Sequence, residues 1–512
     1  MTTTPSGSST PSGTTRSIWM DTGAMPQYAP LAASTDADVC VVGAGIAGIT
    51  TAYNLASMGK RVIVLDDGPV GGGESGRTTA HLANAMDDRF YHLESMHGLD
   101  GARCAASSHG AAINRIEEIV EGENIDCFFR RLDGYLFLGE GGDVAELDKE
   151  YEAAQRAGMT VERLDRAPVQ GFDSGPCLRF ANQATFHPLR FLSAVTEAII
   201  RLGGTVHTGT RVTSVDGGSQ VTVHTRDGHE VRAGAAFIAT NSPAAHYMTP
   251  MKMLPYRTFV VTFALNTSGP DDALYWDTLD PYHYVRRYAG HGQDFLIVGG
   301  GDQGTGTRDQ DESVFDRLEA WARQRFEGLG AVQHRWSGQV LEPADSLAFI
   351  GRDFGHDNVY ICTGDSGQGM THGVIASLLI RDLINGKSNP WEHYYSPTRV
   401  SLGGTREYLH EVMNAGRSFL DYLLPAELDS VDRVQPGQGA LVRRGIHMVA
   451  AYRDPDGTLH ERSATCTHQG CIIRWNTIEK SWDCPCHGSR FDVDGKVLNG
   501  PAVSDLPPAE HP

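Results

Sequence analysis

The chain has 512 residues, of which 40% are hydrophobic and 21% are charged, and its formal net charge is −20. This length allows several domains with large cores, and the acidic balance argues against a nucleic-acid partner, because phosphate binding needs clustered Lys and Arg. We find no apolar run long enough to span a membrane and no apolar signal core at the N-terminus, so we expect a cytoplasmic protein.

The N-terminal segment is poor in side chains that could be buried. Residues 1–16 consist almost entirely of Ser, Thr, Pro and Gly. Such a composition cannot offset the entropy cost of ordering the chain. We therefore expect a disordered tail over residues 1–34.

Residues 38–66 carry the pattern of a dinucleotide-binding unit. An apolar run is followed by three glycines in the GxGxxG spacing, Gly43, Gly45 and Gly48. The first glycine allows a tight turn, the second lets the backbone approach a pyrophosphate, and the third lets the following helix pack on the strand. A second strand ends at Asp66, whose carboxylate can accept hydrogen bonds from a ribose diol. Strand, helix, strand and terminal acid arrive in the expected order.

A glycine-rich loop follows at residues 68–85. Its small residues let the backbone lie against a planar ligand, and Arg77 can offer donors to a phosphate. The spacing of apolar residues then predicts helices at 100–121, 142–157 and 188–203. Alternating or apolar runs predict strands at 205–208, 211–215, 221–225 and 235–240, and then at 257–265, 282–288 and 294–299. The last three suggest a second, largely antiparallel sheet that carries substrate groups.

A second GxGxxG match occurs at residues 298–306, through Gly299, Gly301 and Gly304. The segment after it is polar, and no second strand ending in an acid follows. We therefore interpret it as a strand end and loop rather than a second nucleotide site. Without such a site there is no obvious place for NAD(P)H.

Residues 359–387 repeat the order of strand, glycine loop and helix. A helix N-terminus behind such a loop offers free N–H groups, here suited to the carbonyl edge of a flavin ring. Residues 397–425 then show helical spacing of Leu and Met, and we expect a linker helix over 396–428.

Four segments together carry a family resemblance. The GxGxxG unit, SGRTTAH at 75–81, FIATNS at 237–242 and TGDSGQGMTHG at 363–373 resemble the D-amino-acid oxidase-like superfamily of flavoproteins, which includes glycine oxidase and sarcosine oxidase. The match is spread over residues 36–395. Two further segments, RFANQATFHPLRFL and PYHYVRR, look like the branch of this superfamily that is fused to an iron–sulfur domain. The resemblance implies oxidation of C–N bonds of amines or amino acids by hydride transfer to FAD.

The resemblance also implies the cofactor-binding residues. The three glycines and Asp66 would bind the ADP half of FAD, and Arg77 and Thr78 the pyrophosphate or the ring. The flavin edge would lie against Gly367, Gln368, Gly369 and Met370. In some amine-oxidising relatives a histidine in the position of His81 is joined covalently to the flavin. A histidine that is only hydrogen-bonded near the ring is the alternative that we favour.

Candidate catalytic residues come from the expected second sheet. Tyr282, Tyr284 and Arg286 share one strand face by the period of two. An arginine there could pair bidentately with a substrate carboxylate. The alternative is a solvated charge, since Arg286 and Arg287 point to opposite faces. His187, at an element boundary before a proline, either reaches the pocket or serves as a capping or core histidine.

A metal site is predicted near the C-terminus, where four of the nine cysteines lie between residues 466 and 486. Cys466 and His468 form a CxH pair, and Cys484 and His487 form a CxxH pair. Two cysteines and two histidines could hold zinc. Cys and His are interleaved within each loop, however, which favours a Rieske [2Fe–2S] cluster with two thiolates on one iron and two imidazoles on the other.

The segment CPCHGSRFD followed by GKVLNGPA closely resembles the Rieske domain family, over about residues 430–510. By this resemblance, Cys471 and Cys486 occupy the offsets at which respiratory-type members form a disulfide, and their oxidation state in a cytoplasm is open. Ser489 would donate to a cluster sulfide, whereas Phe491 stands where high-potential members carry Tyr. We expect a middle potential within the Rieske range of about −150 to +300 mV.

The expected fold has three parts. An α/β FAD-binding Rossmann-like domain at 35–395 contains an interleaved α+β antiparallel-sheet substrate domain at about 130–345, and a small all-β Rieske domain occupies 429–512. The leading hypothesis is oxidation of an amine or amino acid, with electrons passing from flavin to the cluster and then to an unknown external electron-transfer partner. Two alternatives stay open: a reductase partner loads the cluster, which reduces FAD, or the Rieske domain is a structural or redox-sensing appendage of an oxidase.

Overall fold

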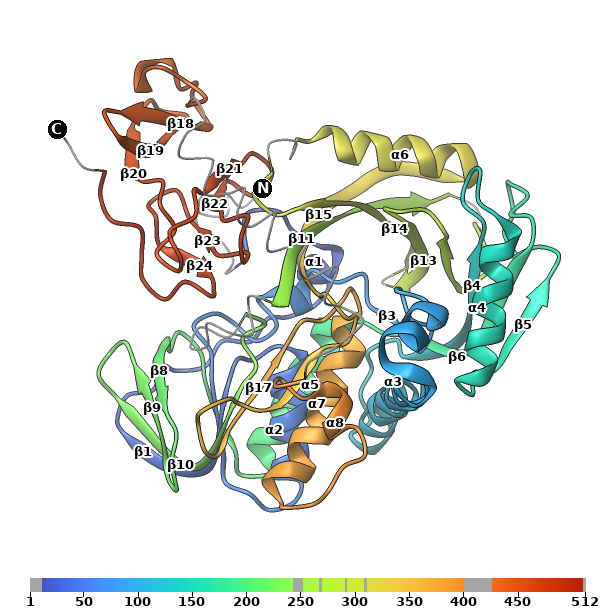
Figure 1. The fold of residues 1–512 in the computed structure, drawn as a ribbon, viewed down its shortest axis with the longest axis horizontal. Helices are drawn as coiled ribbons and strands as arrows, with labels where there is room; N and C mark the ends of the chain where they lie inside the picture. Colours follow the sequence, from blue (N-terminus) through green and yellow to red (C-terminus); the bar gives the residue numbers. More distant parts are fainter. Residues whose placement is uncertain are drawn as a thin grey trace.

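The computed structural model describes residues 12–242, 252–266, 269–290, 292–307, 311–399 and 426–509. Within them, an eight-stranded sheet forms the base of the molecule (Figure 1). Its strand order is β16-β17-β10-β1-β2-β7, with β9 paired to β10 and β8 paired to β9. The strands are β1 (Thr35–Val42), β2 (Val62–Leu65), β7 (Thr205–His207), β8 (Val212–Asp216), β9 (Val221–Thr225), β10 (Glu230–Ile238), β16 (Phe349–Arg352) and β17 (Val359–Thr363).

The centre of this sheet is parallel, as its apolar sequence predicts. β1 pairs in parallel with β2 on one side and β10 on the other, and β10 pairs in parallel with β17. Strands covered on both faces read as nearly continuous apolar runs, and all four residues of β2 are buried. Helix α2 (Ile46–Ala56) packs between α5 (Pro188–Arg201) and α7 (Gly369–Ile384) on one face. This places the N-termini of α2 and α7 at the carboxyl ends of the central strands.

A nine-stranded second sheet stands over the first (Figure 1). Its order is β15-β11-β14-β13-β12-β4-β6-β3, with β5 paired to β6. Each pairing in it is antiparallel except that of β12 with β4, which confirms the expected, largely antiparallel sheet. The strands are β3 (His81–Leu82), β4 (Arg130–Phe137), β5 (Val161–Leu164), β6 (Cys177–Thr185), β11 (Met253–Leu265), β12 (Leu274–Asp277), β13 (His283–Gly290), β14 (Gln293–Gly304) and β15 (Leu329–Pro343).

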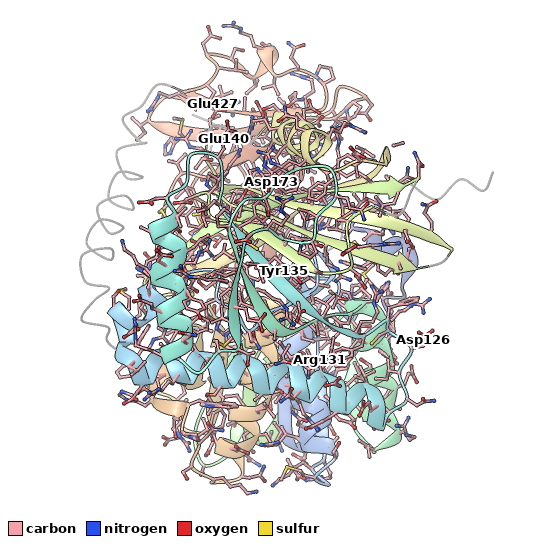
Figure 2. All side chains as sticks on the ribbon, turned by 90° about the vertical axis from the view of Figure 1, so that its right-hand side faces the viewer. Asp126, Arg131, Tyr135, Glu140, Asp173 and Glu427 are labelled. Carbon is pink, nitrogen blue, oxygen red and sulfur yellow. A yellow bond between two sulfur atoms is a disulfide. The ribbon has the colours of Figure 1, made fainter. Side chains whose placement is uncertain are left out.

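Helices surround this second sheet. Helix α3 (Phe90–Gly122) begins earlier than the expected helix and bends at Gly98, while α4 (Val144–Arg156) packs on α3 and α6 (Ser313–Arg325) packs on β11 and β14. Figure 2 shows Arg131 of β4 above α3, where it pairs with Glu117 at 2.5 Å. The short α8 (Glu392–Tyr395) follows α7. None of the helices in the described ranges has the length and apolar character that crossing a bilayer requires.

The C-terminal residues form two small sheets in a separate all-β part (Figure 1). The three-stranded sheet contains β18 (Gln438–Arg444), β19 (His447–Arg453) and β20 (Leu459–Ser463). The four-stranded sheet contains β21 (Arg474–Asn476), β22 (Ser481–Asp483), β23 (Arg490–Phe491) and β24 (Val497–Asn499). Most of the expected linker helix lies outside the described residues.

The N-terminal segment from residue 12 is ordered, so the expectation of a disordered tail over 1–34 is wrong for 12–34, while residues 1–11 lie outside the described part. Helix α1 (Ile18–Thr22) buries Ile18, Trp19 and Met20, and the indole N–H of Trp19 donates to the Thr78 carbonyl at 2.6 Å. The burial of these three apolar side chains favours an ordered segment, which the preceding Ser, Thr, Pro and Gly residues alone would not.

A buried ionic cluster joins the C-terminal domain to the second sheet. The carboxylate of Glu479 lies 3.0 Å from the Arg77 guanidinium and 3.2 Å from that of Arg257, and all three side chains are fully buried. The backbone N–H of Thr15 and the Ser337 hydroxyl also donate to this carboxylate. Burial alone would raise the pKa of Glu479, but the arginine charges outweigh it and lower the pKa to about 2. The N-terminal segment is therefore clamped between the two domains.

Replacing Glu479 with glutamine should destabilise the protein strongly. Glu479→Gln removes the carboxylate that pairs with two buried arginines, and breaking a buried pair in this way costs about 3–5 kcal/mol. Thermal unfolding followed by circular dichroism should show a clearly lower midpoint. The control Glu118→Gln removes an exposed partner of Arg115 and should leave the midpoint nearly unchanged. Equal effects of the two substitutions would contradict this account of the interface.

The stabilisation by Glu479 should depend on pH with a defined sign. Its pKa in the folded chain, about 2, lies below the ordinary value of 4.5, so the stabilisation is complete above about pH 4.5 and is lost as the pH falls towards 2. The difference in unfolding midpoint between the parent protein and Glu479→Gln should therefore shrink on acidification through this window. A difference that stays constant there would show that the charge of Glu479 does not stabilise the fold.

Candidate functional site

A cavity is lined by residues at the N-terminus of α2 and at the N-terminus of α7. The first glycines shape one end as the fingerprint predicts. Gly43 has a φ of +109°, which suits glycine, and a Cβ on Gly48 would lie 1.9 Å from the carbonyl oxygen of Gly43. Asp66 lines this end as well, and its carboxylate accepts from the backbone N–H groups of Ala44 and Gly68.

The other end of the cavity lies at the loop before α7 and holds Gly367, Gln368, Gly369 and Met370. Gly367 has a φ of +75°, and a Cβ there would lie 2.7 Å from Asp87. Several buried polar atoms of lining residues have no hydrogen-bond partner within the described part of the chain: Glu74 Oε1, His81 Nε2, Asn241 Nδ2, Ser242 Oγ, Gln339 Oε1, Gln368 Oε1 and His372 Nε2. Buried polar groups are normally paired, so this lining fits a large polar ligand such as FAD.

Thr78 and His81 also line the cavity. The Thr78 hydroxyl accepts from the backbone N–H of Ala80, which tightens the loop. The Nδ1 of His81 lies 2.9 Å from the Thr79 hydroxyl, and its Nε2 is buried without a partner in the described residues. Burial lowers the pKa of His81 to about 3, so the imidazole is neutral.

Arg77 does not take the role expected from the sequence. Its guanidinium points to Glu479, to the Ser337 carbonyl at 2.9 Å and to Thr15. The charge is thus used in the contact between domains rather than for a pyrophosphate. The separation between residues 77 and 479 in the sequence hides this pairing.

Arg286 and His187 lie outside the cavity lining, which corrects their assignment as candidate catalytic residues. The Arg286 guanidinium is buried and donates to the carbonyls of Thr79 and Ala80, at 3.2 and 2.7 Å. Arg286 therefore supports the 77–82 loop from behind and is not placed to pair with a substrate carboxylate. His187 caps α5, where its Nδ1 accepts from the backbone N–H of Arg190.

Tyr282 and Tyr284 do line the cavity, with ring centroids 5.4 Å apart. Gly299 on the neighbouring strand makes room for them, since a Cβ there would lie 2.1 Å from the Tyr284 ring. The second GxGxxG thus sits mainly in strand β14, which extends to Gly304, further than the strand end and loop expected. Sequence reasoning missed two carboxylates beside these tyrosines, Asp87 and Asp302, for which no motif gives a signal.

The four predicted metal ligands come together on two loops of the C-terminal domain. The thiols of Cys466 and Cys484 are hydrogen-bonded to each other, and the rings of His468 and His487 meet edge to face with centroids 4.9 Å apart. The hydrogen bond from Cys484 lowers the pKa of Cys466 to about 7. Burial lowers the pKa of both histidines, to about 4 for His487, so both imidazoles are neutral and able to bind a metal. This donor set fits a Rieske cluster.

Cys471 and Cys486 form a disulfide beside these ligands. The sulfur of Cys484 lies within 4.8 Å of both, but disulfide sulfurs are not thiolate ligands, so this trio is not a separate metal site. Ser489 hydrogen-bonds to Cys466 and accepts from the backbone N–H of Ala502. Phe491 is fully buried and offers no hydroxyl.

The C-terminal domain forms part of the cavity wall. Residues Val497–Gly500, Ala502 and Val503 line it, and the Arg211 guanidinium donates to the Val497 carbonyl. At the other end, the amide Nε2 of Gln339 donates to the carbonyl of Gly488 at 2.9 Å. Gln339 lines the cavity, and Gly488 follows the candidate ligand His487 directly. One hydrogen bond thus joins the cavity wall to the loop that carries the candidate cluster ligands.

Comparison with known proteins agrees with both parts. The FAD-dependent oxidoreductase (DAO) family matches residues 38–383, and the Rieske [2Fe-2S] domain family matches residues 425–510. The Rieske 2Fe-2S iron-sulfur protein YhfW of Bacillus subtilis is 31% identical over 498 residues, which cover 95% of this chain and 96% of that protein. Gamma-glutamylputrescine oxidoreductase of Escherichia coli is 28% identical over 74% of this chain and 92% of its own length.

Solved structures show the same fold. Glycine oxidase from Geobacillus kaustophilus superposes with a TM-score of 0.60 at 18% identity, over 71% of this chain and 99% of that one. L-proline dehydrogenase from P. horikoshii gives 0.58 at 18% identity, over 72% and 98%. The chain therefore belongs to the DAO family of FAD-dependent oxidoreductases and carries a C-terminal Rieske [2Fe-2S] domain.

Proposed function

We propose that this oxidoreductase oxidises a C–N bond of an amine and passes the electrons, one at a time, from FAD to the Rieske cluster and then to an external acceptor. The observation that carries the proposal is the shared wall. The cavity that fits FAD is closed partly by the Rieske domain, and Gln339 links it to the loop of His487. The proposed path of an electron from this cavity to the cluster would therefore cross a contact that the structure already contains.

The proposal assigns ligands to both cofactors. Gly43, Gly45, Gly48 and Asp66 would hold the ADP half of FAD, where the N-terminus of α2 offers free N–H groups to the pyrophosphate. Thr78, His81 and residues 367–370 would contact the ring. Cys466, His468, Cys484 and His487 would hold the two irons. FAD supplies a two-electron hydride acceptor, and the cluster supplies a one-electron acceptor.

The chain's own residues would prepare the substrate. Tyr282 and Tyr284 form an aromatic wall that excludes water, and Gly299 lets that wall approach the strand behind it. The Tyr282 hydroxyl donates to Asp87 at 2.9 Å, which fixes the ring. A water-poor wall of this kind favours an amine whose lone pair is free when the hydride leaves the adjacent carbon.

The relatives support an amine or amino-acid substrate. The names glycine oxidase, L-proline dehydrogenase and gamma-glutamylputrescine oxidoreductase each describe oxidation of a nitrogen compound. Membership of this family therefore supports C–N oxidation as the reaction that takes place in this cavity. The external acceptor is unidentified, and the cytoplasmic location expected from the sequence stays a prediction.

Removing one thiolate ligand should abolish the cluster without emptying the flavin site. Cys466→Ser should lose the iron and the electron paramagnetic resonance signal of the reduced cluster, because a [2Fe–2S] Rieske centre needs both thiolates. The flavin absorbance per chain should stay unchanged. Cys104→Ser, a buried cysteine far from the site, is the control and should keep its iron. Full iron content in Cys466→Ser would reject the ligand assignment.

Anaerobic mixing with a substrate amine should bleach the flavin first and reduce the cluster afterwards. Stopped-flow absorbance follows the flavin, and freeze-quenched paramagnetic resonance follows the cluster. In Cys466→Ser the flavin should bleach with no second phase. A cluster that stays oxidised after the flavin has bleached would exclude transfer between them. Reduction of flavin only by a reductase partner, with no response to any amine or amino acid, would favour the reversed electron flow instead.

A further inference from the structure

The cavity is acidic near residues 367–370, which would contact the flavin ring, and we call this part the ring end. Asp87, Asp302 and Asp365 line it, together with Tyr282 and Tyr284. Burial is the largest cause that raises the pKa of these three carboxyl groups, to about 7 for Asp87 and Asp365 and to about 6 for Asp302. The charge of Asp302 also raises the pKa of Asp87. A cation bound in this space would therefore supply a countercharge to these buried carboxylates.

Among the described residues, the same space offers an anionic ligand no unengaged arginine or lysine. Within the described residues, Arg77 and Arg211 are the arginines that line the cavity, and no lysine does. Arg77 pairs with Glu479. Arg211 lies near Asp67 and Val497, in the part of the cavity that contains Asp66. Two further arginines near the ring end, Arg89 and Arg286, donate to backbone carbonyls and do not line the cavity.

Two independent features point to a bound ligand at this end. The Nδ1 of His372 lies 2.9 Å from the Asp365 carbonyl, which can only accept, so Nδ1 carries the proton. The Nε2 of this buried, cavity-lining histidine is then an acceptor, and it has no partner in the described part of the chain. The paired rings of Tyr282 and Tyr284 supply π-faces, which attract ammonium groups when water is excluded. Carboxylate, imidazole acceptor and aromatic face all favour a cation.

We propose that the substrate is a cationic amine without a carboxylate on the reacting carbon, and that Asp302 binds its ammonium group between the Tyr282–Tyr284 wall and Asp87. This deepens the proposed function and rests on it. Asp302 is the best placed of the acids, since Thr258 hydrogen-bonds to its carboxylate while its buried Oδ1 has no partner among the described residues. Asp87 by contrast accepts from Tyr282. An α-amino acid would bring its carboxylate into an acidic space where no arginine of the described residues is free to receive it.

The reaction balances with these groups. The bound ammonium gives one proton to a carboxylate and becomes a neutral amine. The nitrogen lone pair then forms the C=N bond as hydrogen leaves the adjacent carbon with both bonding electrons, which FAD accepts as its oxidant. The products are an iminium ion, two-electron-reduced FAD and one protonated carboxyl group. Asp302 and Asp87, whose pKa values lie near neutrality, are suited to take that proton.

Three molecules of one shape test the proposal by binding alone. The tert-butylammonium ion, neutral tert-butanol and the pivalate anion share a tert-butyl group, and none has a hydrogen that could leave as hydride from the carbon next to nitrogen or oxygen. Each is titrated into the oxidised holoenzyme while the visible flavin spectrum is recorded. We expect tert-butylammonium to perturb the spectrum and to bind at least about tenfold more tightly than the other two. Tighter or equal binding of pivalate, or no response to tert-butylammonium, overturns the proposal.

A matched pair of variants locates the charge. Asp302→Asn should weaken tert-butylammonium binding by about tenfold or more while the flavin content stays the same. The control Asp294→Asn makes the same substitution on the same strand, but at a residue that pairs with Arg287 outside the cavity. It should bind as the parent protein does. Equal affinities in Asp302→Asn and the parent protein overturn the assignment of Asp302, and the parent titrations test the cation preference even if Asp302→Asn does not fold.

Substrate pairs separate this proposal from the proposed function. Ethylamine and alanine, and likewise propylamine and 2-aminobutyrate, differ by one carboxylate on the carbon next to nitrogen. Anaerobic flavin bleaching by the amines and not by the amino acids supports both proposals. Bleaching by amino acids in preference to amines overturns the cation proposal and leaves C–N oxidation standing. A cation that binds while no member of either pair bleaches the flavin contradicts the proposed function alone.

Discussion

The buried contact between Glu479 and the arginines Arg77 and Arg257 is the constraint on which the arrangement of this protein depends. A charge removed from water is costly unless it is paired and hydrogen-bonded, and here the carboxylate comes from one domain while both guanidinium groups come from the other. Separating the domains would leave all three charges to find new partners. The N-terminal segment strengthens the same contact, because Thr15 bonds to both Arg77 and Glu479. These charge interactions therefore fix the position of the C-terminal domain against the oxidoreductase part.

The interface separates two cofactor sites with different roles. One side of the contact holds a cavity suited to a two-electron organic cofactor, and the other side holds the ligand set of a one-electron inorganic cluster. The hydrogen bond from Gln339 to Gly488 lies between them. In our proposal, the acidic ring end, with Asp87 and Asp302 beside two tyrosines, selects a cationic amine. Binding, oxidation and electron exit can follow one another within a rigid frame.

The sequence predicted those features that depend on short-range patterns. The glycines at 43, 45 and 48 sit where backbone geometry requires them, and the interleaved Cys and His residues converge as their spacing indicates. The predictions failed where a long-range partner decides the role of a residue. From the sequence Arg77 resembles a phosphate ligand, but in the structure it pairs with Glu479, which is far away in the sequence. From the sequence Arg286 resembles a substrate ligand, but in the structure its guanidinium donates to the carbonyls of Thr79 and Ala80.

Burial explains the remaining differences. Residues 12–16 lack the composition of a folded segment, yet the segment that they begin buries Ile18, Trp19 and Met20 in the core of the oxidoreductase part. No local pattern reveals which surface these side chains will meet. Asp87 and Asp302 likewise carry no motif, because a carboxylate in a cavity is distinguished only by what surrounds it. The corrections therefore concern tertiary contacts, whereas the fold class follows from periodicity and motif order.

The central claim is that FAD and the cluster exchange electrons within one molecule, and the concentration dependence of cluster reduction tests it most directly. After anaerobic reduction of the flavin by an amine, the rate constant for cluster reduction is measured across a dilution series of the protein. The rigid interface predicts a rate constant that does not change with protein concentration. A rate that rises in proportion to concentration would show transfer between separate molecules and would contradict the account.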